Sequence, residues 1–127
     1  MSPTPTADRD KLWDLIKDIK FGMFTTRHSD GHLHSRPMTT QNARLDEDRS
    51  LWLFMSRHGD SAADLQASPE VCMSYADSDN DTYVCVAGNA SVSEDAAKKQ
   101  ALWSPMAKAW FPGGVDDPDL LLVRLDI

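Results

Sequence analysis

The stretch Leu51-Trp52-Leu53-Phe54-Met55 decides the fold class of this 127-residue chain. It is a continuous apolar run, followed by the polar Ser56. A strand with one face in water alternates apolar and polar side chains, whereas an unbroken run is typical of a strand buried on both faces. The stretch therefore predicts a β-sheet protein in which other parts of the structure cover this strand on each side.

Two strands are predicted before this stretch. Gly22–Arg27 forms the first, and Leu33–Leu45 is longer, mostly alternating and polar. Between them, Ser29-Asp30-Gly31-His32 predicts a tight turn, because an Asp-Gly pair suits positive backbone φ. Asp46–Ser50 is predicted to form the next turn. This short spacing indicates antiparallel hairpins.

Three strands and a short helix are predicted after it. Ser61–Ala67 is expected to be a helix that ends before a proline. Val71–Ala76 and Thr82–Val92 are expected to pair around a polar turn at Asp77–Asp81. Leu120–Leu125 is predicted as the last strand.

Helices are also predicted at the start and late in the chain. Apolar residues recur at helical spacing over Ala7–Ile19, with Thr6 as the N-cap. Ser93 is predicted to cap a helix over Glu94–Leu102, and Ser104-Pro105 to begin another short helix that ends at a Pro-Gly-Gly.

The predicted fold is mainly β: a small antiparallel barrel with peripheral helices. Residues 1–7 hold Pro3 and Pro5 among small polar residues and are expected to be a disordered tail. Residues 8–127 are expected to form a single domain, which is the usual domain count for this length.

Composition excludes several classes of partner. The 20 acidic residues exceed the 13 basic ones and give a net charge of −7, so neither nucleic acid nor an anionic membrane is an expected partner. No apolar run approaches the roughly 18 residues of a transmembrane helix, and Met1–Asp10 lacks the apolar core of a secretion signal. Two cysteines cannot form a disulfide framework. We therefore expect a soluble cytoplasmic protein.

Residues that often carry chemistry have simple structural explanations here. His28, His32 and His34 straddle an exposed turn, so they are interpreted as hairpin histidines, and no metal is expected. Cys72 and Cys85 are predicted to lie nearly opposite each other on paired strands and to act as small hydrophobes. A cross-strand disulfide remains an alternative on oxidation, although a reducing cytoplasm argues against it.

Three stretches together favour a ligand. His34-Ser35-Arg36-Pro37-Met38 places an arginine in mid-strand, where it must face solvent or hold an anion. Leu51–Ser56 runs into the loop Arg57–Asp60, which can offer backbone N–H groups. Ala109-Trp110-Phe111-Pro112-Gly113-Gly114 places two large aromatic residues before a turn, where a planar ring could stack.

These stretches, in this order, resemble the pyridoxamine phosphate oxidase-like flavin-binding family, and within it the general stress protein 26 branch. The resemblance runs from about Asp10 to Ile127 and rests on Leu33-His34-Ser35-Arg36-Pro37-Met38, Leu51-Trp52-Leu53-Phe54-Met55-Ser56, Pro69-Glu70-Val71, Tyr83-Val84 with Gly88-Asn89-Ala90, Leu102-Trp103 and Ala109-Trp110-Phe111-Pro112-Gly113-Gly114. It implies a split β-barrel that forms a homodimer with FMN, or FAD, at the subunit interface. The doubly buried Leu51–Met55 is expected to reflect this shared interface.

The resemblance also implies a set of flavin contacts. From one strand these are Arg36, Pro37, Met38 and Thr39; from the next, Phe54, Met55 and Ser56; from the following helix, Ser61 beside the phosphate; and from the late aromatic turn, Trp110 near the ring system. Relatives place a lysine at the start of that helix, but Asp60-Ser61-Ala62-Ala63-Asp64-Leu65 has none. Arg36 is therefore the leading cation for the phosphate and Arg57 the second.

Three functions are compatible with this pattern. The first is a flavin-dependent oxidoreductase, with the redox chemistry carried by the cofactor. The second is a non-catalytic protein that binds or senses a flavin under stress. The third is an interaction module that keeps the barrel without the ligand. Flavin binding is favoured over its absence, and the sequence names neither a catalytic residue nor a substrate.

Overall fold

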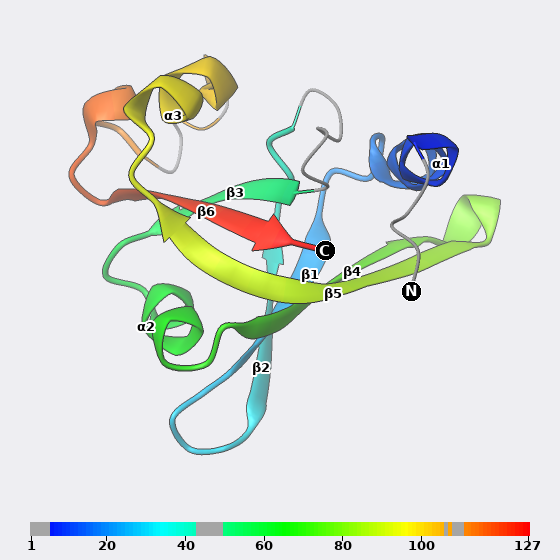
Figure 1. Ribbon diagram of the computed structural model, residues 1–127, viewed down its shortest axis with the longest axis horizontal. Coiled ribbons are helices and arrows are strands. Elements are labelled where there is room, and N and C mark those ends of the chain that lie inside the picture. The colour runs from blue at the N-terminus through cyan, green and yellow to red at the C-terminus, as the bar shows by residue number, and fades with distance from the viewer. Residues whose placement is uncertain (1–5, 43–49, 106, 108–110) are drawn as a thin grey trace.

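The computed structural model describes residues 6–42, 50–105, 107 and 111–127. Its described strands form one six-stranded antiparallel sheet in the order β2-β1-β4-β5-β6-β3 (Figure 1). The strands are β1 (Gly22–Arg27), β2 (Leu33–Met38), β3 (Ser50–Ser56), β4 (Glu70–Asp77), β5 (Thr82–Ser93) and β6 (Leu120–Asp126). The helices are α1 (Thr6–Ile16), α2 (Asp60–Ala67) and α3 (Ala96–Leu102), with short 3-10 turns η1 (Ser78–Asn80) and η3 (Gly114–Asp116).

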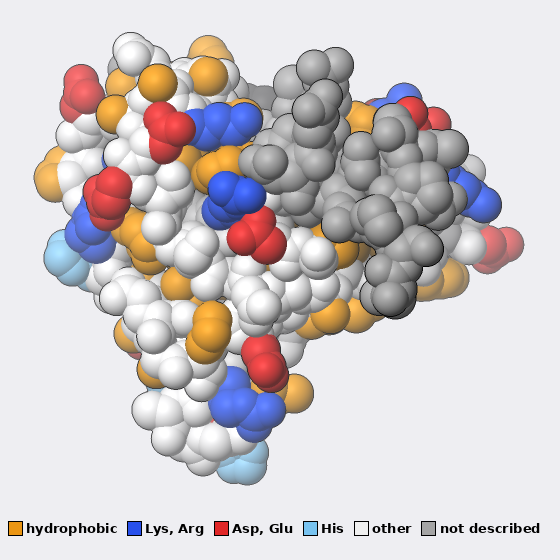
Figure 2. Space-filling model, viewed as in Figure 1, with side chains coloured by type: hydrophobic (Ala, Val, Ile, Leu, Met, Phe, Trp, Pro, Cys, Tyr) orange, Lys and Arg blue, Asp and Glu red, His pale blue; other side chains and the backbone are white. Residues whose placement is uncertain are grey.

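The two edge strands of the sheet meet at one point. Just beyond β2, Thr40 forms a β-bridge with Leu53 of β3, and the Gln41 N–H donates to the Trp52 carbonyl at 2.8 Å. Along β2 itself the described residues pair only with β1. The sheet therefore curls into a barrel that stays split between β2 and β3, as predicted. The β1–β2 hairpin projects from the body as a narrow arm (Figures 1 and 2).

Most strand predictions are confirmed, and the main error is the strand predicted over Leu33–Leu45. β1 has the predicted bounds, and Gly31 in the following turn has a φ of +87°. The long strand ends at Met38, because the chain there leaves the ladder with β1 and crosses to β3. Residues 43–49, which hold the rest of that strand and the predicted turn, lie outside the described residues.

β3 is buried on both faces, as its sequence predicts. Leu51, Leu53 and Met55 face the barrel core, which the other strands and α1 and α2 complete. Trp52 and Phe54 face a second apolar cluster. That cluster contains Ala107, Phe111, Leu120 and Leu122, with Leu102 and Trp103 packed against it. The second face of β3 is thus covered by this chain's own α3 region, so the strand does not require a partner subunit to bury it.

Several helix ends differ from prediction. α1 begins at Thr6, the predicted N-cap, and α2 begins at Asp60 rather than Ser61. α1 ends at Ile16 rather than Ile19. α3 is capped by Asp95, whose carboxylate accepts from the Lys98 N–H at 3.0 Å. The predicted cap, Ser93, instead ends β5, where it pairs with Leu122 of β6. The helix predicted from Ser104 lies largely outside the described residues.

The two cysteines also differ from the prediction. Cys85 pairs with Ser74, and Cys72 pairs with Ala87, so the thiols lie diagonally rather than opposite each other. Both are free thiols. Burial, followed by a hydrogen bond with Cys85, raises the pKa of the Cys72 thiol above 9.0, which keeps it protonated and a poor nucleophile. In the part of the chain that the structure describes, no helix is long and apolar enough to span a membrane.

Candidate functional site

Arg36 lies where the barrel is split. It pairs with the fully buried Phe24 of β1, so both side chains lie on the inner face of the sheet. The Arg36 side chain is 25% exposed, and one terminal nitrogen donates to the Thr26 hydroxyl at 3.0 Å. Its other terminal nitrogen lies 3.9 Å from a carboxylate oxygen of Asp64. Arg36 is thus anchored at the end of the barrel while part of its guanidinium stays open to solvent.

Asp64 connects three elements at this end of the barrel. It lies on the buried face of α2, with a side chain only 3% exposed. Its Oδ2 accepts from the Thr26 hydroxyl at 2.9 Å, and its Oδ1 lies 2.8 Å from Nδ1 of His28, which directly follows β1. We call Thr26, His28, Arg36 and Asp64 the Asp64 cluster. His28 is therefore not the exposed hairpin histidine that the sequence predicts, because it is partly buried against Asp64.

The Asp64 cluster keeps its carboxylate ionised. Burial by itself raises the pKa of Asp64, but hydrogen bonds with Thr26 and His28 and the charge of Arg36 outweigh it, and the pKa lies below 3.8. The hydrogen bond to Asp64 raises the pKa of His28 above 6.5, against a smaller opposing effect of burial. The His28 ring also lies 4.6 Å, between centroids, from the ring of His34. A proton on His28 is therefore stabilised by the buried carboxylate of Asp64.

The helix after β3 begins without a side-chain cap. Gly59 occupies the N-cap of α2 and supplies no side-chain acceptor for the first-turn N–H groups. Ser61 lies in this first turn and is 6% exposed, one turn before Asp64 on the same buried face. Uncapped N–H groups and the helix dipole favour an anion. Arg36 thus contacts α2 at Asp64, one turn after this uncapped start.

The two predicted flavin-contact strands line the split. Extending the Thr40–Leu53 register places Thr39 and Met38 across from Phe54 and Met55, although no bridge joins them in the ranges described. Met38 packs on the barrel core and Pro37 faces outward. Among the described residues these two strands are not paired here, so their facing backbone edges have no ladder partner in each other.

The β3 side chains themselves are mostly engaged in packing. Phe54 points into the second apolar cluster, with its ring centroid 6.0 Å from that of Trp103. Met55 is buried in the barrel core. Ser56 donates to both carboxylate oxygens of Asp119, at 2.8 and 2.7 Å, and so anchors the start of β6. The structure thus brings the predicted strands together but turns these side chains away from the split. Trp110 lies outside the described residues.

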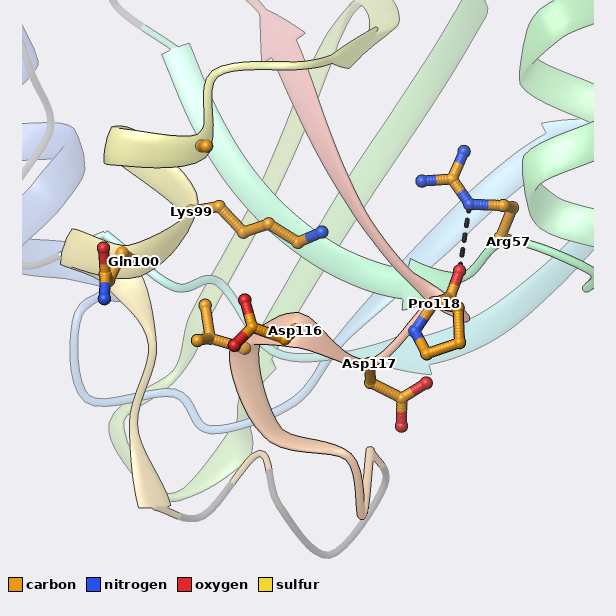
Figure 3. A pocket seen from close by; sticks show the side chains of 8 residues that line it. Arg57, Lys99, Gln100, Asp116, Asp117 and Pro118 are labelled. Carbon is orange, nitrogen blue, oxygen red and sulfur yellow. Dashed lines mark hydrogen bonds between the residues drawn. The ribbon is translucent and has the colours of Figure 1, made fainter.

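Arg57 lies in a different part of the molecule from the Asp64 cluster. Together with Lys99, Gln100, Asp116 and Pro118 it lines a hollow of about 300 Å³ between the end of β3, α3 and η3 (Figure 3). Its Nε donates to the Pro118 carbonyl at 3.2 Å. Arg57 is therefore outside the Asp64 cluster, whose arginine is Arg36.

Comparison with known proteins identifies the fold family. The family model described as "Pyridoxamine 5'-phosphate oxidase like" matches residues 7–127. The chain belongs to this family.

Within the pyridoxamine 5'-phosphate oxidase-like family, the chain is similar to general stress proteins. It is 29% identical over 121 residues to general stress protein 26 of Bacillus subtilis (strain 168), a match that covers 93% of this chain and 82% of that protein. It is 29% identical to the solved general stress FMN/FAD binding protein of Xanthomonas citri, with a TM-score of 0.76 and coverage of 96% and 84% of the two chains. The structure of general stress protein 26 from Bacillus anthracis has the same fold, with a TM-score of 0.77 at 24% identity. The match covers 93% of this chain and 85% of the Bacillus anthracis chain.

Sequence reasoning missed the partners of Arg36. Alternation along β1 places Thr26 on the same face as Phe24, which was a usable signal. The spacing of three between Ser61 and Asp64 also predicts a shared helix face. His28 carried no such signal, because only the folded hairpin brings it to α2. Asp64 contacts Thr26 of β1, His28 after β1 and Arg36 of β2. Its position near the start of a helix that also begins with Asp60 did not indicate this role.

Proposed function

We propose that the protein binds a flavin nucleotide, FMN or FAD, along the split between β2 and β3. The observation that carries the proposal is the partly exposed guanidinium of Arg36, held beside Asp64 of α2, a helix whose first turn has no side-chain cap. A guanidinium and helix N–H groups together suit a phosphate group. The Xanthomonas citri relative, whose name states FMN/FAD binding, supports the same ligand class.

The residues of the split fit a phosphate ester with a planar ring. Arg36 would hold the phosphate, with the first turn of α2 and Ser61 beside it. Pro37, Met38 and Thr39 would run along the flavin from β2, and the open backbone edge of Phe54–Ser56 would face it from β3. Trp110 is proposed to lie near the ring system. The flavin, when bound, supplies the redox chemistry, and the chain binds and orients it.

We propose that two copies of the chain share this site in a homodimer. The outer face of β1, β4 and β5 is the surface that supports the proposal. Its central side chains are uncharged: Met23, Thr25, Cys72, Ser74, Ala76, Tyr83, Cys85 and Ala87. A groove of about 390 Å³ on this face is flanked by Phe21, Met23 and Tyr83, which are 53%, 42% and 67% exposed. An uncharged surface with exposed large apolar residues is typical of an interface.

Flavin-dependent oxidoreduction is the proposed activity, and a non-catalytic flavin-binding or sensing protein is the alternative. One observation favours the alternative. Asp64, the buried carboxylate among the described residues, is committed to His28, Thr26 and Arg36 and so is not an available base. Turnover would therefore depend on the cofactor and on substrate positioning.

Titration of purified protein with FMN, FAD and riboflavin tests the proposal. We expect a yellow protein with a flavin absorbance band, and tighter binding of FMN than of riboflavin. Failure to bind any flavin would overturn flavin binding. Oxidation of a nicotinamide donor by the flavin-loaded protein would then favour the enzyme, and its absence the non-catalytic alternative.

A further inference from the structure

The Asp64 cluster divides one negative charge between two basic groups. Oδ2 of Asp64 faces Arg36 and accepts from Thr26, while Oδ1 lies against His28. Because the carboxylate is 3% exposed, water screens these contacts little. The charge of His28 therefore changes the electrostatic potential at Arg36, because both groups contact the same carboxylate.

The net charge of the cluster depends on one proton. With His28 neutral, the positive charge of Arg36 and the negative charge of Asp64 cancel. With His28 protonated, Asp64 is paired with His28 and the cluster carries a net charge of one positive unit. An anion that binds the open side of Arg36 is attracted more strongly in the second state.

We propose that Asp64 masks the charge of Arg36 and that protonation of His28 removes the mask, so that the phosphate end of a flavin nucleotide binds more tightly as pH falls. This inference rests on the proposed flavin site. Asp64 and His28 act on the ligand through Arg36 and are positioning residues rather than catalytic ones.

The surroundings of His28 suit this role. Its side chain is 27% exposed, so it exchanges protons with solvent. Besides Asp64, it is faced by Asp60 of α2 and Asp30 of the β1–β2 turn, which both favour its charged form. His34 of β2 stacks on it and would oppose that charge if protonated, but His34 lies 3.3 Å from the carboxylate of Asp30. The three acidic groups Asp30, Asp60 and Asp64 thus outnumber the two basic groups, His34 and Arg36.

The size of the effect follows from the added charge. One positive charge near a partly exposed arginine changes phosphate affinity by about three- to tenfold after screening by salt. A phosphate monoester loses part of its own charge below about pH 6. The measurement therefore compares about pH 6.5 with about pH 8.5, because the pKa of His28 is raised above its ordinary value and the charge of the ligand changes little over this range.

The test is calorimetric titration of FMN and riboflavin at these two pH values. Riboflavin has the same ring without the phosphate, so the ratio of the two affinities isolates the phosphate contact. We expect the FMN preference to be about three- to tenfold larger at the lower pH in the wild type. His28→Gln should make the preference independent of pH. His32→Gln is the matched control, because His32 is exposed on the same hairpin and its side chain is outside the cluster.

Asp64→Asn provides a second variant that keeps the shape and an acceptor for Thr26. We expect it to bind FMN more tightly than the wild type at the higher pH, with a pH dependence of the FMN preference that moves to lower pH because His28 loses its partner carboxylate. We also expect it to lower the pKa of His28 followed by NMR. If Asp64→Asn fails to fold by circular dichroism, the His28→Gln and His32→Gln pair decides the question alone.

The outcomes separate the two proposals. If FMN binds but its preference over riboflavin is the same at both pH values, or changes equally in His28→Gln, this inference is wrong and flavin binding stands. If neither flavin binds at either pH, both proposals are wrong.

Discussion

Arg36 is the residue on which the proposed phosphate contact depends. Charge-assisted hydrogen bonds contribute about 1.5–3 kcal/mol each, so Arg36→Ala is expected to reduce FMN affinity at least tenfold, toward that of riboflavin. Riboflavin affinity should hardly change. Arg57→Ala is the matched control, since Arg57 lines the separate hollow beside Pro118. Calorimetric titration of both variants measures the effect, and an unchanged FMN affinity in Arg36→Ala would assign the phosphate elsewhere.

His28 and Asp64 also predict how stability depends on pH. The pKa of His28 is raised in the folded protein above 6.5, so its contribution is fully present below the unfolded value and is lost as pH rises through the folded one. Unfolding by urea should therefore show that His28→Gln is destabilising at about pH 6 and nearly neutral at about pH 9. Equal destabilisation at both pH values would show that the His28 proton does not contribute.

The contribution of Asp64 to stability changes with pH in the opposite direction. Its pKa is depressed in the folded protein below 3.8, so its contribution is present above that value and is lost as pH falls through the folded pKa. The stability difference between wild type and Asp64→Asn should therefore be large near neutral pH and shrink in acid. A difference that stays constant into acid would mean that ionisation of Asp64 contributes nothing to stability.

At the scale of single elements, the strands could be predicted well and the helix ends less well. Alternation defines β1 residue by residue, and the apolar run defines β3. Ser93 is a good local cap, but pairing of β5 with β6 holds it in the sheet and moves the cap to Asp95. Local signals fail where tertiary pairing competes with them, which is also why the strand predicted over Leu33–Leu45 ends early.

β3 gives the clearest prediction about an element. Leu53 is 0% exposed in the barrel core, and Phe54 is 9% exposed on the opposite face. Leu53→Ala should cost about 2–5 kcal/mol and Phe54→Ala about 3–5 kcal/mol in unfolding free energy, because both faces are packed. Leu15→Ala, on an exposed position of α1, should stay within about 0.5 kcal/mol. A cost below about 1 kcal/mol for Phe54→Ala would show that the α3 region does not cover this face.

At the scale of the whole molecule, the sequence predicted the barrel and the two strands that line its split, but not the centre of the site. Arg36 could be predicted as a site residue because an arginine in mid-strand must either face solvent or hold an anion. Its partners come from a turn, a strand and a helix that only the closed barrel brings together. The expected basis for a homodimer also changed, since this chain's own α3 region covers β3. The outer face of β1, β4 and β5, whose central side chains are uncharged, is the surface that now supports the proposed dimer.

The last prediction places a charge on that surface. Met23 lies in the middle of the uncharged face and beside the apolar groove, so Met23→Glu would bury an unpaired carboxylate in the proposed interface. A stable dimer of this kind should bury upwards of about 2,000 Å² in total. We expect sedimentation to show a dimer for the wild type at micromolar concentration, a monomer for Met23→Glu, and weaker FMN binding by that monomer. Ala97→Glu, on an exposed position of α3, should remain dimeric and bind FMN as the wild type does. A wild-type monomer that binds FMN fully would place the whole flavin site within one chain and contradict the shared interface.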